Sequence, residues 1–271
     1  MTYLIGPGRP LDPARYFVIA MDAIGAGRSS SPISTGLRTK FPRYNIRDLV
    51  RAQCLALTQG LGLSYLPCVL GLSMGGYMAI EWAVMYPAFV RRAVCLVSAA
   101  RCAPHSRIIH EGLRTAIMTD PAWKGGDYEE NPVAGLEAAA TANFAWRHGD
   151  EWYLQYCDRE LFGMHLEATR QRYRMLDACS FVHMTHACDV HDVSEPYGGN
   201  LAMALGRARM PVLVMPCATD LLIPPVHARV MHELLPNSTY VEIPSYAGHT
   251  ASSLEVEFIG EQVGRFLGSR E

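Results

Sequence analysis

The feature of this sequence that most constrains its fold is a serine among glycines, placed where an apolar run gives way to a helical pattern. The segment GLSMGG (71–76) ends the apolar run LPCVLGLS (66–73) and opens a helical stretch over 75–85. A G-x-S-x-G motif in this position is typical of a strand, a sharp turn and a helix, which together expose the serine hydroxyl. Glycines flanking the serine avoid Cβ atoms that would clash in such a turn. The glycines of this elbow are Gly71, Gly75 and Gly76.

Short β-branched runs alternate with longer helical patterns on both sides of this motif. The predicted strands are 16–21 (YFVIAM), 66–73, 92–99 (RAVCLVSA), 211–215 (PVLVM) and 239–243 (TYVEI). Helices are predicted over 46–61, where apolar residues recur near a 3.6-residue period, and over 75–85 and 254–267. Strands and helices that alternate with short connections imply right-handed crossovers and a parallel sheet.

The strand rhythm stops in the middle of the chain. From 101 to 209 the sequence is rich in alanine, aromatic residues and histidine, with helical patterns and no convincing β run. We therefore predict an α/β core formed by residues 1–100 and 210–271. Residues 101–209 would form a helical cap inserted into that core.

Composition excludes several classes of protein. The 271 residues include 24 Lys plus Arg and 26 Asp plus Glu, so the chain lacks the basic footprint of a nucleic-acid binder. No apolar run approaches the roughly 18 residues of a membrane span, and the N-terminus does not resemble a secretory signal. The eight cysteines are scattered without a C-x-x-C pair, which favours free thiols in a reducing compartment. We expect a cytoplasmic protein with no nucleic-acid or membrane partner.

A serine nucleophile needs a base, and the base needs an orienting carboxylate. In a strand–turn–helix architecture of this kind, the chain order is serine, acid, histidine. Asp220 follows the predicted strand at 211–215, and His249 follows the predicted strand at 239–243. Both positions are at carboxyl ends of strands, where open α/β sheets bind ligands. The sequence therefore predicts a catalytic triad of Ser73, Asp220 and His249.

Other candidate sites have weaker patterns. The segment HMTHACDVHD (183–192) offers histidine and aspartate at helix-like spacing but has no zinc signature, so we predict no metal site. The loop at 25–28 (GAGR) lacks the glycine pattern and acidic partner of a dinucleotide site. Aromatic residues of the predicted cap, such as Trp146 and Trp152, are interpreted as cap core, some of them lining an acyl pocket.

These residues resemble a known family. The resemblance is carried by YFVIAMDAIGAGRSSSP, FPRYNIRDLVRAQ, GLSMGGYMAIEWAVMYP, LDACSFVHMTHACDVHDV and TDLLIPP followed by Gly-His. They are similar to the homoserine O-acetyltransferase family, the acyltransferase branch of the α/β-hydrolase superfamily. The resemblance implies an α/β-hydrolase fold with Ser73 as nucleophile, Asp220 as orienting acid and His249 as base. It also implies that the backbone N–H of Met74 is one oxyanion donor.

The resemblance further implies a ping-pong reaction without a bound cofactor. Acetyl-CoA, or another acyl-CoA, would acylate the serine, and an alcohol acceptor beneath the cap would take the acyl group. The family also suggests a homodimer.

The chain departs from the family pattern in two places. The family usually has Asp directly after the catalytic histidine, where the carboxylate helps to hold the amino group of homoserine, but here the residue is Thr250. A hydroxyl cannot supply the charge pairing that an ammonium group prefers. In addition, YLIGPG (3–8) resembles the loop that follows the family's first three strands, so we expect those strands to be missing from this chain. The loop after the third strand supplies the second oxyanion donor, so we predict an incomplete active site.

Three hypotheses stay open at this point. The first is an O-acyltransferase acting on an alcohol other than homoserine, with Thr250 as a substrate contact. The second is an esterase that uses the same three residues with water as acceptor. The third is a non-catalytic binding protein on a truncated hydrolase scaffold.

Overall fold

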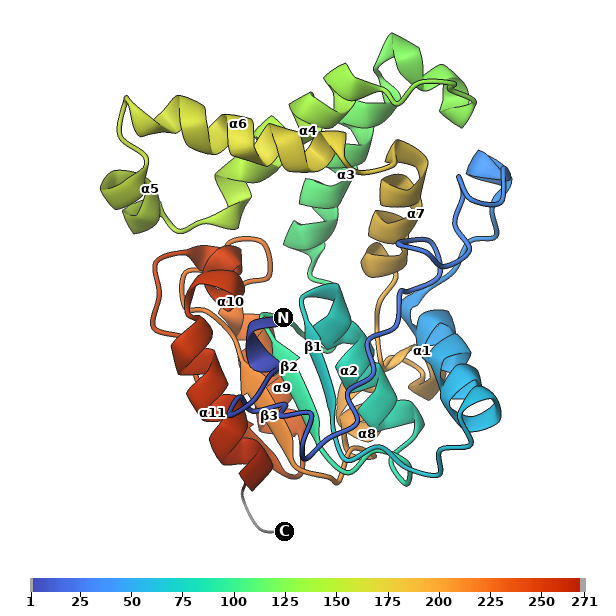
Figure 1. The fold of residues 1–271 in the computed structure, drawn as a ribbon, viewed down its shortest axis with the longest axis vertical. Helices are drawn as coiled ribbons and strands as arrows, with labels where there is room; N and C mark the ends of the chain where they lie inside the picture. Colours follow the sequence, from blue (N-terminus) through green and yellow to red (C-terminus); the bar gives the residue numbers. More distant parts are fainter. Residues whose placement is uncertain (1, 269–271) are drawn as a thin grey trace.

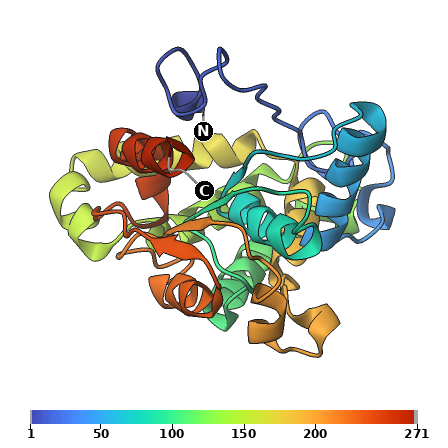
Figure 2. The ribbon, with the colours of Figure 1, turned by 90° about the horizontal axis from the view of Figure 1, so that it is seen from below.

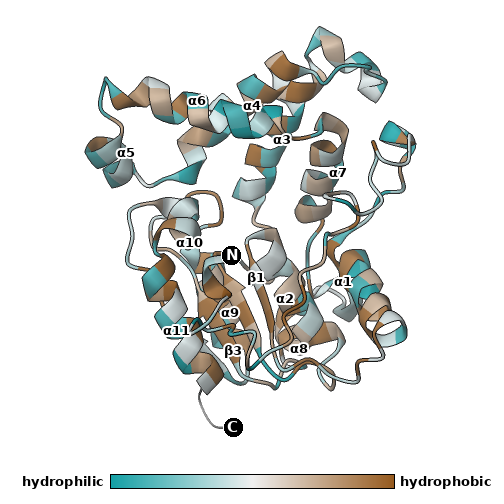
Figure 3. Cartoon of the chain, in the orientation of Figure 1, coloured by the Kyte–Doolittle hydropathy of each residue, from teal (hydrophilic) through white to brown (hydrophobic). Residues whose placement is uncertain are grey.

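A four-stranded parallel sheet forms the centre of the molecule. The computed structural model describes residues 2–268. The strands lie in the order β1-β2-β3-β4, which is also their order along the chain. They span Val69–Leu72 (β1), Ala93–Leu96 (β2), Val212–Met215 (β3) and Ser238–Tyr240 (β4). Strands β1, β2 and β3 consist almost entirely of hydrophobic residues, and Figure 3 shows the centre of the sheet in brown, as expected of parallel strands covered on both faces.

Helices cover both faces of the sheet (Figures 1 and 2). One face packs against helices α1 (Ile46–Leu55), α2 (Met74–Met85), α8 (Leu201–Leu205) and α9 (Pro225–Leu234). The other face packs against helix α11 (Val256–Gly268), which follows the short helix α10 (Ala251–Leu254). Alternate strand residues divide between these cores, with Cys95 and Val214 on the α2 side and Val94 and Leu213 on the α11 side.

Helix α1 illustrates how local sequence defines the boundaries. Asn45 accepts a hydrogen bond from the Asp48 N–H at 2.9 Å, and the Asp48 carboxylate accepts from the Asn45 N–H at 3.1 Å. This reciprocal cap satisfies N–H groups that have no acceptor inside the helix. The helix continues as a π-helical turn over Ala56–Gly60, so the prediction of a helix over 46–61 is confirmed.

Helices α3 to α7 lie beyond the carboxyl ends of the strands (Figure 1). They are α3 (Pro104–Met118), α4 (Val133–Arg147), α5 (Asp150–Tyr156), α6 (Leu161–Arg174) and α7 (Ala178–Asp189). Side chains of α3, α4, α6 and α7 form a separate hydrophobic cluster, which includes Leu113, Leu136 and Phe181, whereas Trp152 of α5 packs in the core on the α11 side of the sheet. We call this layer the helical cap.

Two crossing segments join the helical cap to the sheet. The outgoing segment follows β2, and the returning segment precedes Val193. The Cys102 N–H donates to the His191 carbonyl at 2.9 Å, and the Val193 N–H donates to the Ala100 carbonyl at 3.1 Å. Within the described part of 101–209, this isolated pairing is the nearest approach to β structure, as the sequence predicts.

Four of the five predicted strands are present, and one is absent. The strand predicted over 239–243 is shorter than expected: β4 ends at Tyr240, and Ile243 makes only an isolated bridge to Cys217. The strand predicted over 16–21 is wrong, because that segment is irregular and Phe17 is 80% exposed. Within residues 2–268, β1 pairs only with β2, so no neighbouring strand offers the 16–21 segment a hydrogen-bonded ladder.

Two expectations from composition concern the cysteines and membrane-spanning segments. All eight cysteines are free thiols. Within residues 2–268, no helix combines the length and the hydropathy needed to cross a lipid bilayer.

Candidate active site

Ser73 lies on a strained turn between β1 and α2. Its backbone has φ 56° and ψ −119°, a region that residues with a side chain rarely adopt. The surrounding hydrogen bonds enforce this conformation: the Ser73 N–H donates to the Leu96 carbonyl at 2.9 Å. The Ser73 carbonyl accepts from the N–H groups of Gly76 at 2.8 Å and Tyr77 at 3.0 Å. The turn therefore projects the hydroxyl beyond the end of the sheet.

The three glycines of the elbow differ in the space that a Cβ atom would find at each position. A Cβ on Gly71 would lie 1.8 Å from the Gly75 carbonyl oxygen, and a Cβ on Gly76 would lie 2.4 Å from the Cβ of Ser98. A Cβ on Gly75 would meet no atom within 4 Å outside its own helix. The predicted steric role is therefore found for Gly71 and is wrong for Gly75, whose carbonyl is the group that Gly71 must approach.

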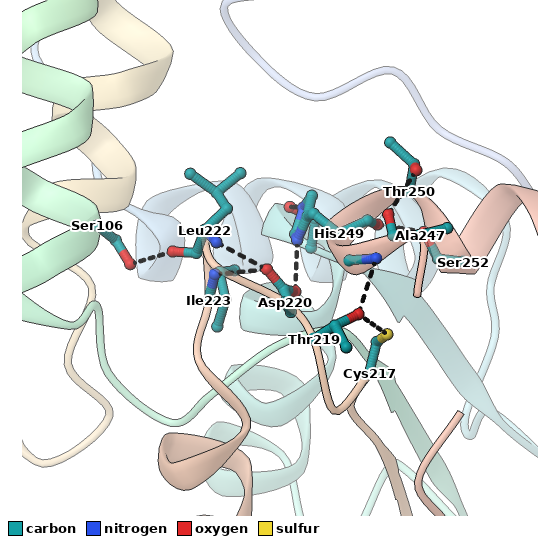
Figure 4. A network of polar contacts seen from close by, with 12 residues as sticks. Ser106, Cys217, Thr219, Asp220, Leu222, Ile223, Ala247, His249, Thr250 and Ser252 are labelled. Atoms are coloured by element: carbon teal, nitrogen blue, oxygen red, sulfur yellow. Dashed lines mark hydrogen bonds and ion pairs between the residues drawn. The ribbon is translucent and has the colours of Figure 1, made fainter. Parts of the chain in front are cut away.

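The three residues of the predicted triad come together in one hydrogen-bonded chain. His249 Nε2 is 2.8 Å from Ser73 Oγ, and His249 Nδ1 is 2.8 Å from Asp220 Oδ2 (Figure 4 shows the contact between His249 and Asp220). Because a carboxylate can only accept, the Nδ1 atom carries the proton and Nε2 is free to accept from the serine hydroxyl. This is the tautomer that a general base at Ser73 requires.

The sheet places all three side chains at the same edge. Ser73 follows β1, Asp220 lies in the loop after β3, and His249 lies in the turn at Gly248–Thr250, after β4. Since the strands are parallel, their carboxyl ends meet at one edge of the sheet, beneath the helical cap.

Asp220 is held by its own loop. Its side chain is fully buried, and its Oδ1 atom accepts from the N–H groups of Leu222 at 2.9 Å and Ile223 at 2.8 Å (Figure 4). With Oδ2 directed at His249, both carboxylate oxygens have partners. Such a buried acceptor stabilises the protonated imidazole that forms during acyl transfer.

Met74 is the first residue of α2. The N–H groups of a helix's first turn have no acceptor within the helix, and they carry the positive end of the helix dipole. The Met74 N–H is therefore in a position suited to an anionic oxygen bound at Ser73.

Thr250 does not face an open charged pocket. Its hydroxyl donates to the Ala247 carbonyl at 2.7 Å, and its oxygen lies 3.0 Å from Nδ1 of His148 in the helical cap. The His148 ring stacks on Trp152, with ring centroids 3.7 Å apart and an interplanar angle of 11°. Burial, with a smaller effect from Arg147, lowers the pKa of His148 to about 4, so this neighbour of Thr250 is uncharged near neutral pH.

The sequence gives no motif that singles out His148. It lies in the segment RHGDEW (147–152), at the end of an alanine-rich helix. A His-Gly pair after a helix is common and is usually only a helix end. It contacts the loop that follows β4 and carries His249 (241–250), which we call the histidine loop, and this contact depends on how the helical cap folds back over the sheet.

The histidines and aspartates of 183–192 are dispersed rather than gathered. His183 stacks on Tyr44, and the buried His191 stacks on Tyr77 with ring centroids 4.3 Å apart. Asp189 instead lies beside His110 and Cys102, with the potential ligand atoms of these three within 4.8 Å of one another.

The cluster of Cys102, His110 and Asp189 fits a metal ion poorly. Arg114 ion-pairs with Asp189 at 2.6 Å, and the carboxylate also contacts His110 at 2.7 Å. Burial raises the pKa of the Cys102 thiol to about 11, which disfavours the thiolate that a metal would bind.

Residues 7–255 match the family model described as the alpha/beta hydrolase fold. The chain belongs to the α/β-hydrolase family. Its relatives include homoserine O-acetyltransferase of Geobacter sulfurreducens, 35% identical over 99% of this chain and 79% of the relative. Ethyl acetate hydrolase of Pseudomonas veronii is also 35% identical, over 90% of this chain and 73% of the relative. Among solved structures, the acetyl esterase MekB superposes with a TM-score of 0.93 at 32% identity, covering 98% of this chain and 81% of that one.

This α/β-hydrolase is therefore similar to the homoserine O-acetyltransferases, as the sequence motifs predict. It is an enzyme of acyl transfer or ester hydrolysis, since both activities occur among relatives of equal similarity. The alternative of a non-catalytic binding protein is not supported.

Proposed function

We propose that Ser73 carries an acyl group from an ester or thioester donor to an uncharged acceptor, which is water or a neutral alcohol. The observation that carries this proposal is the continuous chain from Ser73 Oγ through the His249 ring to Asp220, with both contacts at 2.8 Å. Hydrogen-bond distance between nucleophile and base, with the base oriented by a third group, is the requirement of nucleophilic acyl transfer.

In the first half-reaction, Ser73 Oγ attacks the donor carbonyl while its proton passes to His249 Nε2. The Met74 N–H would stabilise the oxyanion, and the buried Asp220 carboxylate stabilises the imidazolium. His249 then returns the proton to the departing alkoxide or thiolate, which leaves an acyl-Ser73 ester. In the second half-reaction, His249 takes a proton from the acceptor, whose oxygen attacks the acyl carbonyl. His249 then returns that proton to Ser73 Oγ as the acyl–oxygen bond of Ser73 breaks.

The proposal for the acceptor rests on the surroundings of His249. Thr250 is bonded to a neutral imidazole and to a backbone carbonyl, so it presents no negative charge to a substrate ammonium. An amino-acid acceptor such as homoserine would lose that pairing, whereas water or a neutral alcohol needs none. This favours hydrolysis of short neutral esters over acetylation of homoserine.

A fluorophosphonate probe tests the nucleophile. The wild-type protein should be labelled at Ser73, while Ser73→Ala should be unlabelled and should fold normally. Ser34→Ala, at a serine in the N-terminal loops, is the matched control and should label like the wild type. Wild-type protein that is folded yet unlabelled would contradict the assignment.

The acceptor is tested by following products from two donors, p-nitrophenyl acetate and acetyl-CoA. We expect acetate as the product from at least one donor, at a rate that L-homoserine does not change. Formation of O-acetylhomoserine as the main product would instead support the homoserine acetyltransferase reaction.

A further inference from the structure

A corner of the helical cap lies directly on the loops that carry His249 and Asp220. The corner consists of His148 and Gly149, between α4 and α5, and we call it the cap corner. The Gly149 N–H donates to the Tyr246 carbonyl at 3.0 Å, three residues before His249. The helical cap is therefore hydrogen-bonded to the histidine loop itself.

The approach of the two backbones requires glycine on both sides. A Cβ on Gly149 would lie 2.7 Å from the Cβ of Thr219 and 2.9 Å from the Tyr246 carbonyl oxygen. A Cβ on Gly248 would lie 2.7 Å from the Arg147 carbonyl oxygen and 2.8 Å from the His148 Cα. Gly248 also has φ +59°, a conformation that favours glycine. Gly248 and Gly149 thus allow a contact that larger residues would force apart.

Two side chains next to triad residues also take part in this region: Thr250, which follows His249, and Thr219, which precedes Asp220. His148 Nδ1 lies 3.0 Å from Thr250 Oγ1, directly after His249. Thr219, directly before Asp220, donates to the Ser245 carbonyl at 2.9 Å and accepts from the Gly248 N–H at 3.2 Å. The cap corner therefore contacts the residues on both sides of His249 and the residue before Asp220.

The His249 ring depends on this support more than its partners do. Among the described residues, its ring nitrogens bond only to Ser73 and Asp220, so its orientation follows the backbone of the turn at 247–250. A shift of that backbone by a fraction of an ångström would disturb the 2.8 Å contacts of the ring with Ser73 and Asp220.

We propose that the cap corner positions His249, with the His148 side chain holding the turn through Thr250. This inference rests on the proposed function for its kinetic consequence, but the geometry of the His249–Asp220 contact can be tested without turnover. His148 acts through Thr250 and is a positioning residue, not a group that reacts.

Two substitutions separate the hydrogen bond of His148 from its stacking. His148→Asn keeps a polar group near the position of Nδ1 but loses the ring, whereas His148→Phe keeps a ring on Trp152 but loses the hydrogen bond. His165→Phe is the matched control, because His165 also contacts the Trp152 ring, with centroids 5.2 Å apart, and has no hydrogen bond to the histidine loop.

For p-nitrophenyl acetate, we expect His148→Phe to lower kcat about tenfold with KM nearly unchanged, as expected from the loss of one buried hydrogen bond. His148→Asn should restore most of kcat, and His165→Phe should match the wild type. In proton NMR spectra, the His249 Nδ1–H signal should be present in wild type and His148→Asn and broadened in His148→Phe. If His148→Phe does not fold, Thr250→Val removes the same hydrogen bond and should give the same loss.

An unchanged kcat together with an unchanged Nδ1–H signal in His148→Phe or Thr250→Val would overturn the positioning role. Equal losses in His148→Asn and His148→Phe would also overturn it, since packing alone would then explain the effect. If the wild type has no turnover and no fluorophosphonate labelling, the proposed function fails, and the NMR comparison alone decides the positioning role.

Discussion

Asp220 and His249 sit next to each other but are held in place in different ways. Asp220 is held locally, because its fully buried carboxylate accepts two N–H groups from residues two and three positions later in the same loop. His249 lies in a turn that has hydrogen bonds of its own and that also contacts the cap corner, about a hundred residues earlier in the chain. The position of Asp220 is therefore set within one short segment, whereas the position of His249 also depends on how the helical cap folds onto the sheet.

Because of this difference, substitutions at Asp220 and substitutions in the helical cap should change the reaction rate by different amounts. Changes to the Asp220 carboxylate alter the chemistry of the His249 ring directly, through its tautomer and charge. Changes to the helical cap alter only where that ring lies. Changes to Asp220 should therefore lower the rate more than changes to the helical cap.

The largest effect is expected from Asp220→Asn. The introduced amide would donate toward His249 Nδ1 and favour the tautomer with the proton on Nε2, which cannot accept from Ser73. We expect kcat to fall about 10⁴-fold with little change in fold. Initial rates with p-nitrophenyl acetate would measure this.

Asp150→Asn is the control for this substitution, since it removes an exposed carboxylate in the first turn of α5. It should keep wild-type kcat. A fall in kcat of less than about tenfold in Asp220→Asn would mean that His249 does not need the Asp220 carboxylate to act as base.

The next effect concerns the strained turn at Ser73, which depends on the close approach of Gly71 to the Gly75 carbonyl. Gly71→Ala would place a Cβ 1.8 Å from the Gly75 carbonyl oxygen, so we expect a loss of about 3 kcal/mol in the free energy of unfolding, or failure to fold. Gly75→Ala meets no such atom and exchanges glycine for a better helix former, so it should be neutral or stabilising by up to about 1 kcal/mol. Urea denaturation of the two variants would compare them.

Equal destabilisation by Gly71→Ala and Gly75→Ala would contradict the asymmetry of the elbow. The two substitutions are chemically identical and four residues apart, so any difference between them reports the local geometry alone.

The sequence predicts which residues form the triad, because that prediction needs only their positions relative to predicted strands and helices. The G-x-S-x-G segment lies between a strand and a helix, and Asp220 and His249 follow their strands in the expected order. Three of the predicted strands contain β1, β2 and β3, because buried parallel strands are short runs of apolar residues bounded by turns.

The features that the sequence misses depend on partners elsewhere in the chain. The YFVIAM segment has the composition of a strand, yet it forms none without a neighbouring strand to pair with. The His148 contact was missed because no local pattern reports which loop a helix end will meet. The steric role expected of Gly75 was wrong for a similar reason, since the neighbours of a Cβ are set by the fold.

The third prediction concerns the pH dependence of stability that arises from buried histidines, one of which is His148 of the cap corner. Burial lowers the pKa of His148 to about 4 and that of His191 to about 3, below the ordinary value of about 6.5. The unfolded chain therefore binds more protons in this range, so stability is complete above about pH 6.5 and falls as the pH is lowered. Each histidine should cost about 2 kcal/mol of unfolding free energy at about pH 5.

His148→Asn isolates one of the two histidines. Its loss of stability between about pH 7 and pH 5 should be smaller than that of the wild type by about 2 kcal/mol, measured by urea denaturation at each pH. A pH dependence identical to that of the wild type would show that His148 is not held neutral by the fold.

The smallest expected effect is a change of acceptor preference at Thr250. Thr250→Asp would place a carboxylate beside His249, where it could pair with the ammonium group of an amino-acid alcohol, and such a charged hydrogen bond is worth about 1.5 kcal/mol. We expect the ratio of O-acetylhomoserine to acetate to rise about tenfold, measured by mass spectrometry of the products. Thr250→Asn has the same shape without the charge, so it should leave the ratio unchanged. A rise in both variants would trace the preference to the shape of the side chain at position 250, and its lack of charge would then not determine which acceptor is used.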